Sequence, residues 1–240
     1  MHIIITKDYD ELSEKAARII IETVRQKPNA VLGLATGTTP LGLYKNLIAD
    51  HKENGTSYKN IRTVNLDEYK GLPATHPQSY AYFMRKNLFD HIDIDIANTY
   101  IENGVATDEQ AECERYDEIL EKLPREIQLL GLGSNGHIAF NEPGTSFEST
   151  THVVTLAEST IKDNARLFND ISEVPRKAYT MGLKSIMQAK KIIVLANGLN
   201  KAEIVSKLMY GKPSEELPAS ILYNHKDCTV ILDQEAASRL

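Results

Sequence analysis

Short apolar runs alternate along this chain with longer segments in which apolar residues recur at helical spacing. Apolar runs of strand length occupy residues 3–6, 31–35, 61–66, 127–133, 191–196 and 229–232. Helical spacing begins near Asp8 and near Pro40, and it covers residues 79–88, 108–123 and 201–210. This alternation is typical of βαβ units, in which a mostly parallel sheet carries helices on both faces. We therefore predict a single α/β domain that spans residues 1–240.

Residues at the ends of these segments support the predicted boundaries. Asp8-Tyr9-Asp10-Glu11 has the spacing of a capping box and opens the first helix. Pro28-Asn29 breaks that helix. Pro40 suits a first helical turn, because its missing N–H has no partner there in any case. Gly211 stands where it can end the helix over residues 201–210.

Polar or glycine-rich segments follow four of the predicted strands. They are residues 36–40, 67–69, 134–137 and 197–198. Ligands of open parallel sheets bind beyond the carboxyl ends of the strands, and these ends lie along one edge of the sheet. We therefore predict that the four segments meet there and form a binding site.

Charge and hydrophobic content indicate which kind of protein this is and which kind of partner it binds. The chain has a net charge of −6 and is 42% hydrophobic, values typical of soluble globular domains that do not bind nucleic acid through a basic face. No apolar run approaches the ~20 residues of a membrane helix, and the N-terminus lacks the pattern of a signal peptide. We expect a cytoplasmic protein with a small-molecule partner. The two cysteines, Cys113 and Cys228, are expected to be small, partly buried free thiols.

Two of the four segments carry recognisable chemistry. In Thr36-Gly37-Thr38-Thr39-Pro40, backbone N–H groups, hydroxyls and the start of a helix suit a phosphate group. An ordinary tight turn between strand and helix is the alternative, since the Gly-Lys-Ser/Thr ending of a P-loop is missing. Asp67 follows a strand directly, where partial desolvation suits a general base. A helix cap or a solvated turn is the alternative for this carboxylate.

The stretch from Gly131 to Pro143 is the most informative part of the sequence. A buried strand leads into glycines, then His137, and five residues later Glu142. A carboxylate beside an imidazole orients it and favours its protonated form, so we interpret this pair as catalytic instead of structural. The other histidines form no metal-binding pattern, and we predict no metal and no cofactor. Lys201 begins a helix, where the helix dipole disfavours a cation, and this placement indicates a functional role.

At these residues the chain closely resembles the glucosamine-6-phosphate deaminases. The matching motifs are Leu34 through Pro40, Leu66 through Leu72, His76 through Tyr80, and Gly136 through Pro143. The resemblance implies that Asp67 relays a proton between C2 and C1 of the sugar, that His137 assists opening of the pyranose ring, and that Glu142 is its acidic partner. It implies that the phosphate and substrate contacts come from Thr36, Gly37, Thr38, Thr39, Gly136, Arg166 and Lys201.

The same resemblance implies a modified doubly wound, Rossmann-like fold with a mobile active-site lid at about residues 152–175. Three departures from the family pattern matter. Many members have Asp where this chain has Asn135, which we count with the catalytic set. An allosteric site for N-acetylglucosamine 6-phosphate in longer members uses two cations, which align with His152 and Val154 here. Those members also have a C-terminal tail that this sequence lacks, and we expect an unregulated monomer.

Two rival functions remain open. A 6-phosphogluconolactonase shares the implied fold and has a similar Gly-Asp-Gly-His stretch, but it needs no acid–base pair that spans C1 and C2. The motifs around Asp67 and Glu142 favour the deaminase. A non-catalytic sugar-phosphate sensor is the rival from another class. Such regulators usually carry a DNA-binding helix-turn-helix extension, and the sequence contains none.

Overall fold

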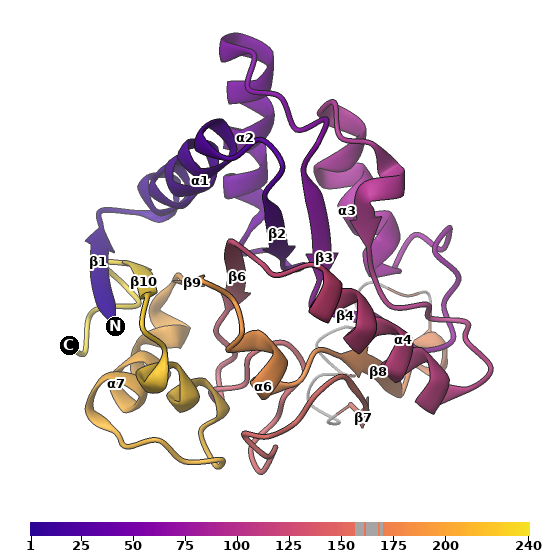
Figure 1. Cartoon of the computed structure of the whole chain (residues 1–240). Coiled ribbons are helices and arrows are strands. Elements are labelled where there is room, and N and C mark those ends of the chain that lie inside the picture. The colour runs from indigo at the N-terminus through magenta and orange to yellow at the C-terminus, as the bar shows by residue number, and fades with distance from the viewer. Residues whose placement is uncertain (157–160, 162–167, 169) are drawn as a thin grey trace.

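The computed structural model describes residues 1–156, 161, 168 and 170–240. Its centre is a seven-stranded sheet of strand order β1-β10-β9-β6-β2-β3-β5 (Figure 1). Every neighbouring pair of strands in it is parallel. The strands are β1 (His2–Thr6), β2 (Val31–Leu34), β3 (Arg62–Asn65), β5 (Thr99–Tyr100), β6 (Ile127–Gly131), β9 (Lys191–Ala196) and β10 (Cys228–Asp233). The prediction of an α/β fold with a mostly parallel sheet is therefore confirmed.

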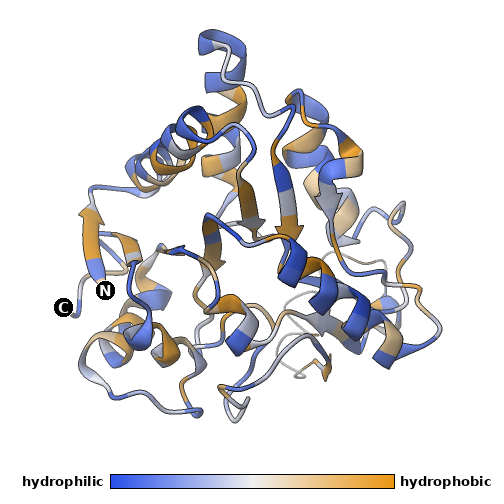
Figure 2. Ribbon diagram, in the orientation of Figure 1, coloured by the Kyte–Doolittle hydropathy of each residue, from blue (hydrophilic) through white to orange (hydrophobic). Residues whose placement is uncertain are grey.

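Helices cover the sheet on both sides, with α1 and α2 packed together on one side and α6 and α7 on the other (Figure 1). The α-helices are α1 (Tyr9–Gln26), α2 (Leu41–Asn54), α3 (Tyr80–Asn87), α4 (Glu109–Lys122), α6 (Leu183–Ile186) and α7 (Ala202–Tyr210). Short 3₁₀ helices cover Phe89–His91, Ile96–Asn98, Ile171–Glu173, Leu199–Lys201 and Pro218–Asn224. Most strands of the large sheet are mainly apolar, whereas most helices have one apolar and one polar face (Figure 2). Strands such as β9 are buried on both faces, which explains their continuous apolar sequence.

The predicted end signals act as expected. The Asp8 side chain accepts a hydrogen bond from the Glu11 N–H at 3.0 Å and caps α1. The Glu11 carboxylate in turn accepts from the Lys7 N–H at 2.8 Å. Pro40 is the N-cap of α2, and Gly211 is the C-cap of α7. Local sequence chemistry therefore sets where these helices begin and end.

A second sheet was not predicted from the sequence. It consists of β4 (Asp67–Tyr69), β8 (Lys177–Thr180) and β7 (His152–Thr155), in the antiparallel order β4-β8-β7. Thr180 lies opposite Asp67 on one side and opposite His152 on the other. These strands are short and partly polar, so they lack the apolar run by which the other strands were found. Asp67 thus begins a strand and does not lie in a free turn.

The predicted lid lies only partly within the described residues. Outside the described residues lie 157–160, 162–167 and 169, a set that includes Arg166. Of the remainder, Leu156, Ile161 and Val174 are buried in a small apolar cluster that also contains Tyr69 and Phe140. The lid therefore stays a prediction.

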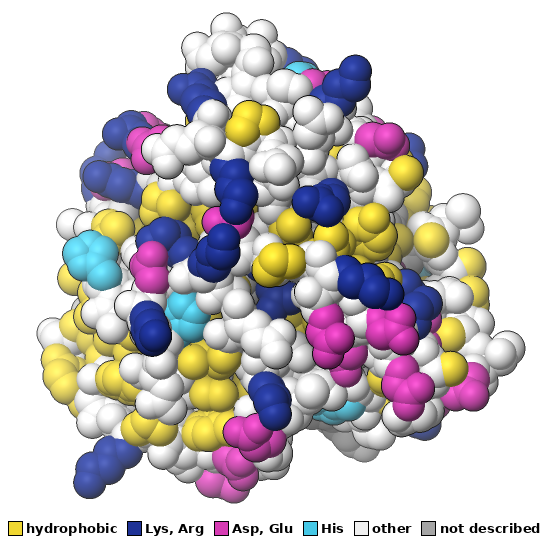
Figure 3. Space-filling view, viewed as in Figure 1, with side chains coloured by type: hydrophobic (Ala, Val, Ile, Leu, Met, Phe, Trp, Pro, Cys, Tyr) yellow, Lys and Arg dark blue, Asp and Glu magenta, His cyan; other side chains and the backbone are white. Residues whose placement is uncertain are grey.

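Three expectations from the sequence can be compared with the structure. Cys113 and Cys228 are both buried free thiols, as expected. On the face seen in Figure 3, Lys and Arg side chains are scattered and form no continuous basic patch, whereas Asp and Glu gather mainly at the lower right. Within the described part of the chain, no helix is both long and apolar enough to cross a bilayer.

Candidate active site

A cavity of about 210 Å³ lies where the strand order of the large sheet reverses. On one side of this point β2 is followed by β3 and β5, and on the other side β6 is followed by β9 and β10. Such switch points are the usual ligand sites of doubly wound sheets. The segments that follow β2, β3 and β6 all line the cavity. The fourth predicted segment adjoins them, since Thr39 Oγ1 donates to Asn197 Oδ1 at 3.3 Å.

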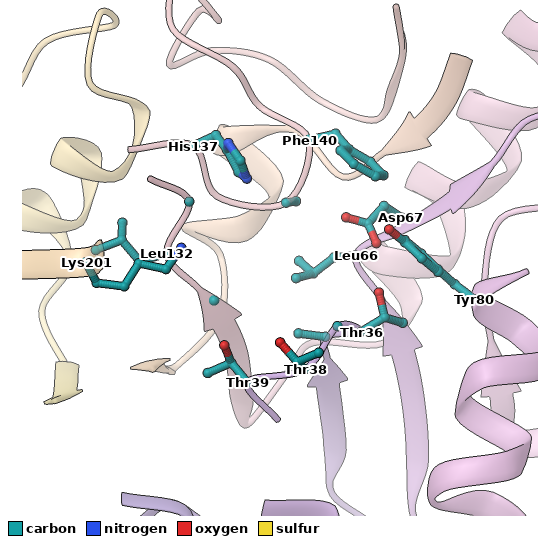
Figure 4. A pocket seen from close by; sticks show the side chains of 15 residues that line it. Thr36, Thr38, Thr39, Leu66, Asp67, Tyr80, Leu132, His137, Phe140 and Lys201 are labelled. Atoms are coloured by element: carbon teal, nitrogen blue, oxygen red, sulfur yellow. The ribbon is translucent and has the colours of Figure 1, made fainter. Parts of the chain in front are cut away.

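The loop after β2 forms one end of the cavity. Gly37 has φ of 98°, a left-handed conformation that only glycine adopts readily, and it turns the chain between β2 and α2. The hydroxyl groups of Thr36, Thr38 and Thr39 lie along the edge of the cavity (Figure 4). The loop leads directly into α2, whose first backbone N–H groups supply a partial positive charge.

Lys201 adds a full positive charge to the cavity lining. It stands in the 3₁₀ turn Leu199–Lys201 just before α7, as its position in the sequence predicted. Burial lowers the pKa of Lys201. None of the acidic side chains in the described residues forms an ion pair with it. A partly desolvated cation without a counter-charge is well suited to bind an anion.

Asp67 lines the cavity on the side opposite His137 (Figure 4). Its side chain is buried, with only 7% of the residue exposed. Burial, with a smaller contribution from the charge of Glu68, raises the pKa of Asp67 to about 8. A carboxyl group with this pKa exchanges protons near neutral pH, as a general acid–base group requires.

Glu68 has a different role from its neighbour. Its carboxylate oxygens accept hydrogen bonds from the N–H groups of Tyr69, Tyr80 and Ala81 at 2.8 to 2.9 Å. Two of these donors belong to the first turn of α3. Burial raises the pKa of Glu68 to about 7, and the three N–H groups oppose this shift. Glu68 therefore anchors α3 to β4, which leaves Asp67 as the carboxyl group that faces the cavity.

Glu102 is a buried acid that the sequence analysis did not single out. It is 2% exposed, and neither carboxyl oxygen has a hydrogen-bond partner among the described residues. Burial raises the pKa of Glu102 well above its usual range, and the charge of Asp67 adds to this shift. Burial without a hydrogen-bond partner among the described residues therefore favours the neutral form of Glu102.

His137 is held by a tight turn after β6. The Gly133 N–H donates to the His137 carbonyl at 2.9 Å, and the Gly136 N–H donates to the Gly133 carbonyl at 3.0 Å. A Cβ on Gly133 would lie 2.4 Å from atoms of the imidazole, so the ring packs directly on this glycine. Gly133 thus has a steric reason, which is to let the ring reach the cavity.

Asn135 connects His137 to Glu142. The Asn135 Nδ2 donates to Glu142 Oε2 at 2.6 Å, which leaves Oδ1 to face the histidine. The Asn135 Oδ1 accepts from the His137 backbone N–H at 3.1 Å and lies 2.7 Å from Nδ1 of the ring. Because this oxygen can only accept, Nδ1 carries the proton and Nε2 is free to accept one. Burial lowers the pKa of His137; Glu142 opposes this shift and Lys201 adds to it.

Most of the residues predicted for the site come together around the cavity. Thr36, Gly37, Thr38, Thr39, Asp67, His137 and Lys201 line it. Asn135 and Glu142 lie behind His137, outside the lining. Gly136 also lies outside it; it is buried beside Leu217, and its carbonyl accepts from the Ala219 N–H. Its contact with substrate stays a prediction, and Arg166 lies outside the described residues.

Two aromatic residues line the cavity without having been predicted as site residues, Tyr80 and Phe140. Their rings stack at a centroid distance of 6.1 Å, and Tyr80 lies next to Asp67 (Figure 4). Both lie in the motifs that carry the resemblance, and this was the signal by which they could have been found. No group of His, Cys, Asp and Glu in the described part of the chain is arranged to hold a metal ion.

Comparison with known proteins agrees with this geometry. Residues 7–231 match the family described as glucosamine-6-phosphate isomerases/6-phosphogluconolactonase. The glucosamine-6-phosphate deaminase of Geobacillus sp. (strain WCH70) is 54% identical over 99% of this chain and 95% of its own. Glucosamine-6-phosphate deaminase 1 of Bacillus subtilis (strain 168) is 52% identical over 99% of both chains.

Solved structures show the same relationship. A monomeric glucosamine-6-phosphate deaminase superposes with a TM-score of 0.98 over 100% of both chains, at 51% identity. The 6-phosphogluconolactonase of Trypanosoma brucei reaches a TM-score of 0.80 at 23% identity, over 100% of this chain and 98% of its own, and shares the fold alone. The doubly wound sheet, the cavity at its switch point and the identity along the whole chain lead to one conclusion: the chain belongs to the family of glucosamine-6-phosphate isomerases and 6-phosphogluconolactonases.

Proposed function

We propose that this protein converts glucosamine 6-phosphate and water into fructose 6-phosphate and ammonia, as a monomer in the cytoplasm. One observation carries the proposal: a buried carboxyl group with a raised pKa and an imidazole with a lowered pKa face one cavity from opposite sides, next to the Thr36–Thr39 loop (Figure 4). Relatives with more than half of their residues identical carry the name of this activity. A relative of the same fold that is monomeric supports the monomer.

The phosphate of the substrate binds between the Thr36–Thr39 loop and Lys201. The loop offers hydroxyl and backbone donors, and the lysine offers a charge without a counter-ion among the described acidic groups. A phosphate fixed at this remote end holds the sugar so that its reacting carbons lie between Asp67 and His137. Orientation of this kind supplies much of the rate of an intramolecular proton transfer.

Ring opening begins at His137. Its Nδ1–H is held by Asn135 Oδ1, so the free Nε2 accepts the proton of the C1 hydroxyl. The resulting imidazolium then protonates the ring oxygen, and the C1–O5 bond breaks to give the open aldose. Glu142 stabilises the imidazolium, since its Oε1 lies 3.6 Å from Nδ1.

Isomerisation and loss of the amine depend on Asp67. Its carboxylate removes the proton from C2 and returns it to C1 through an enol-type intermediate. One proton passes from the C2 ammonium group to the C1 oxygen in this step, which leaves an iminium group at C2. Water adds to its C=N bond and the nitrogen leaves as ammonia, so the net reaction hydrolyses a C–N bond. A pKa of about 8 in the free site makes Asp67 a much stronger base than an exposed aspartate.

The direct test is to incubate the purified protein with glucosamine 6-phosphate and to measure ammonia and fructose 6-phosphate together. Equal amounts of both products support the proposal. Release of 6-phosphogluconate from its lactone, without ammonia from the amino sugar, would assign the protein to the lactonase branch instead.

A second test isolates Asp67. In heavy water with fructose 6-phosphate and ammonia, the native enzyme is expected to incorporate deuterium at C1, whereas Asp67→Asn is not. Turnover of the variant is expected to fall by about 10²–10⁴-fold, the usual effect of losing a general base. The matched control is Asp10→Asn, the same change at an exposed position of α1. Deuterium exchange at the native rate in Asp67→Asn would show that another group carries the proton.

A further inference from the structure

Tyr9 contacts the cavity loop from outside the cavity. It lies in the first turn of α1, far in sequence from the loop after β2. Its hydroxyl group is 3.1 Å from the Thr38 carbonyl oxygen and 3.0 Å from the Thr39 carbonyl oxygen. The same hydroxyl accepts a hydrogen bond from the Gly42 N–H at 2.8 Å. One side chain thus touches the loop at two consecutive carbonyls and the helix that follows it.

The start of α2 explains why such a contact is needed. Its N-cap is Pro40, which has no side chain able to accept a hydrogen bond from the first turn. The Gly42 N–H would otherwise be one of the unpaired donors of the helix N-terminus. The Tyr9 hydroxyl accepts from it and so replaces the missing side-chain cap. The two helices can approach this closely because residue 42 is glycine; a Cβ there would lie 2.3 Å from Ser13 Oγ of α1.

Together with the Leu41 N–H, which donates to the Thr38 carbonyl at 3.3 Å, this contact fixes which way the loop peptide faces. In a trans peptide the C=O and the N–H point in opposite directions. When the Thr38 carbonyl is held by Tyr9, the N–H of Thr39 in the same peptide unit points away from Tyr9. Thr38 and Thr39 line the cavity, whereas Tyr9 does not. The Thr39 N–H is therefore directed to the cavity side of the loop, where an anion can accept its hydrogen bond.

We propose that Tyr9 is a positioning residue for phosphate binding, whose hydroxyl holds the Thr38–Thr39 peptide with its N–H toward the cavity. The proposal rests on the proposed function only for the identity of the anion, a sugar phosphate. Tyr9 touches neither substrate nor reacting atoms. Its effect is expected in the binding of phosphate groups and not in the chemical step at Asp67 and His137.

The test replaces Tyr9 with phenylalanine, which removes the hydroxyl and keeps the ring. The loss of this hydrogen-bonded group is expected to raise KM for glucosamine 6-phosphate about 3- to 10-fold, with kcat within about twofold of native. The inhibition constant of inorganic phosphate is expected to rise by the same factor. Tyr210→Phe is the matched control, because Tyr210 is 73% exposed at the end of α7, away from the loop.

A second measurement separates this proposal from the proposed function. Calorimetric titration with inorganic phosphate measures anion binding without any turnover. Weaker phosphate binding in Tyr9→Phe than in the native chain and in Tyr210→Phe supports the positioning role, even if the native chain does not deaminate the amino sugar. Equal phosphate affinity in all three proteins overturns it, and a lower melting temperature of Tyr9→Phe would then show that the hydroxyl only stabilises the junction of α1 and α2.

Discussion

Replacement of Asp67 by asparagine is expected to stabilise the protein while it removes the proposed base. The pKa of an aspartate in an unfolded chain is about 3.9. In the folded protein, burial raises the pKa of Asp67 to about 8. At pH 7 the unfolded chain therefore carries a charged Asp67, and folding must bind a proton to it. Asparagine has no charge to neutralise, so the variant folds without this cost.

The size of the effect follows from proton linkage. Between pH 3.9 and pH 7 the unfavourable contribution grows by roughly 1.4 kcal/mol per pH unit, which gives an upper limit of about 4 kcal/mol at pH 7. Asp67 contributes most to stability below pH 4, and this contribution is lost as the pH rises toward 8. For a chain of this length, ~2–4 kcal/mol corresponds to an increase of about 5–10 °C in the melting temperature.

The assay is urea or thermal unfolding of native protein and Asp67→Asn at pH 5, 6, 7 and 8. Glu68 and Glu102 titrate in both proteins, so the difference between the two curves isolates Asp67 and its coupling to these neighbours. We expect the difference in the free energy of unfolding to be small at pH 5, to grow toward pH 8 and to favour the variant. A difference that does not change with pH would refute the desolvation of Asp67. The control Asp10→Asn is expected to show no such trend.

Three further predictions concern the setting of His137 and the regulation of the enzyme. Asn135→Asp places an anion 2.7 Å from His137 Nδ1 and next to Glu142, so the apparent pKa of His137 in the pH–activity profile should rise. A fall in this pKa would show that residue 135 does not tune the histidine. Gly133→Ala should displace the imidazole and lower turnover at least tenfold with little change in phosphate affinity, and unchanged turnover would show that the ring can move without loss. With His152 and Val154 in place of two cations, substrate saturation should be hyperbolic, and a sigmoidal curve that N-acetylglucosamine 6-phosphate abolishes would contradict this.

The large sheet could be predicted from the sequence because burial on both faces makes its strands continuously apolar. Residues 191–196, for example, form β9 with the predicted bounds. The meeting of the loops at the carboxyl ends of the strands could also be predicted, because the strands are parallel. Thr36, Asp67 and His137 accordingly line one cavity. The small sheet could not be predicted in this way. Its strand β4 is Asp-Glu-Tyr, and it is a strand only because β8, from a distant part of the chain, pairs with it.

The different roles of neighbouring residues in the site could not be predicted from the sequence either. Asp67 and Glu68 are neighbours of the same chemical type, and nothing local distinguishes a base from an anchor. Glu68 becomes an anchor because α3 places two N–H groups on its carboxylate. The contact of Tyr9 with the Thr38 and Thr39 carbonyls likewise depends on how α1 packs on α2. Such roles arise from tertiary packing and leave no periodic signal.

The contacts of Thr180 limit where the sequences of two related proteins can be joined in a chimaera. It pairs with Asp67 and with His152, and its hydroxyl oxygen accepts the N–H of Phe140, three residues beyond His137. Residues joined in this way have effects that do not add when they are changed together. The apolar interior of the large sheet tolerates exchange of similar side chains far better. A chimaera of two relatives should therefore inherit β4, β8, β7 and the His137 loop from one parent, and crossovers between them are expected to yield folded proteins with misaligned acid and base.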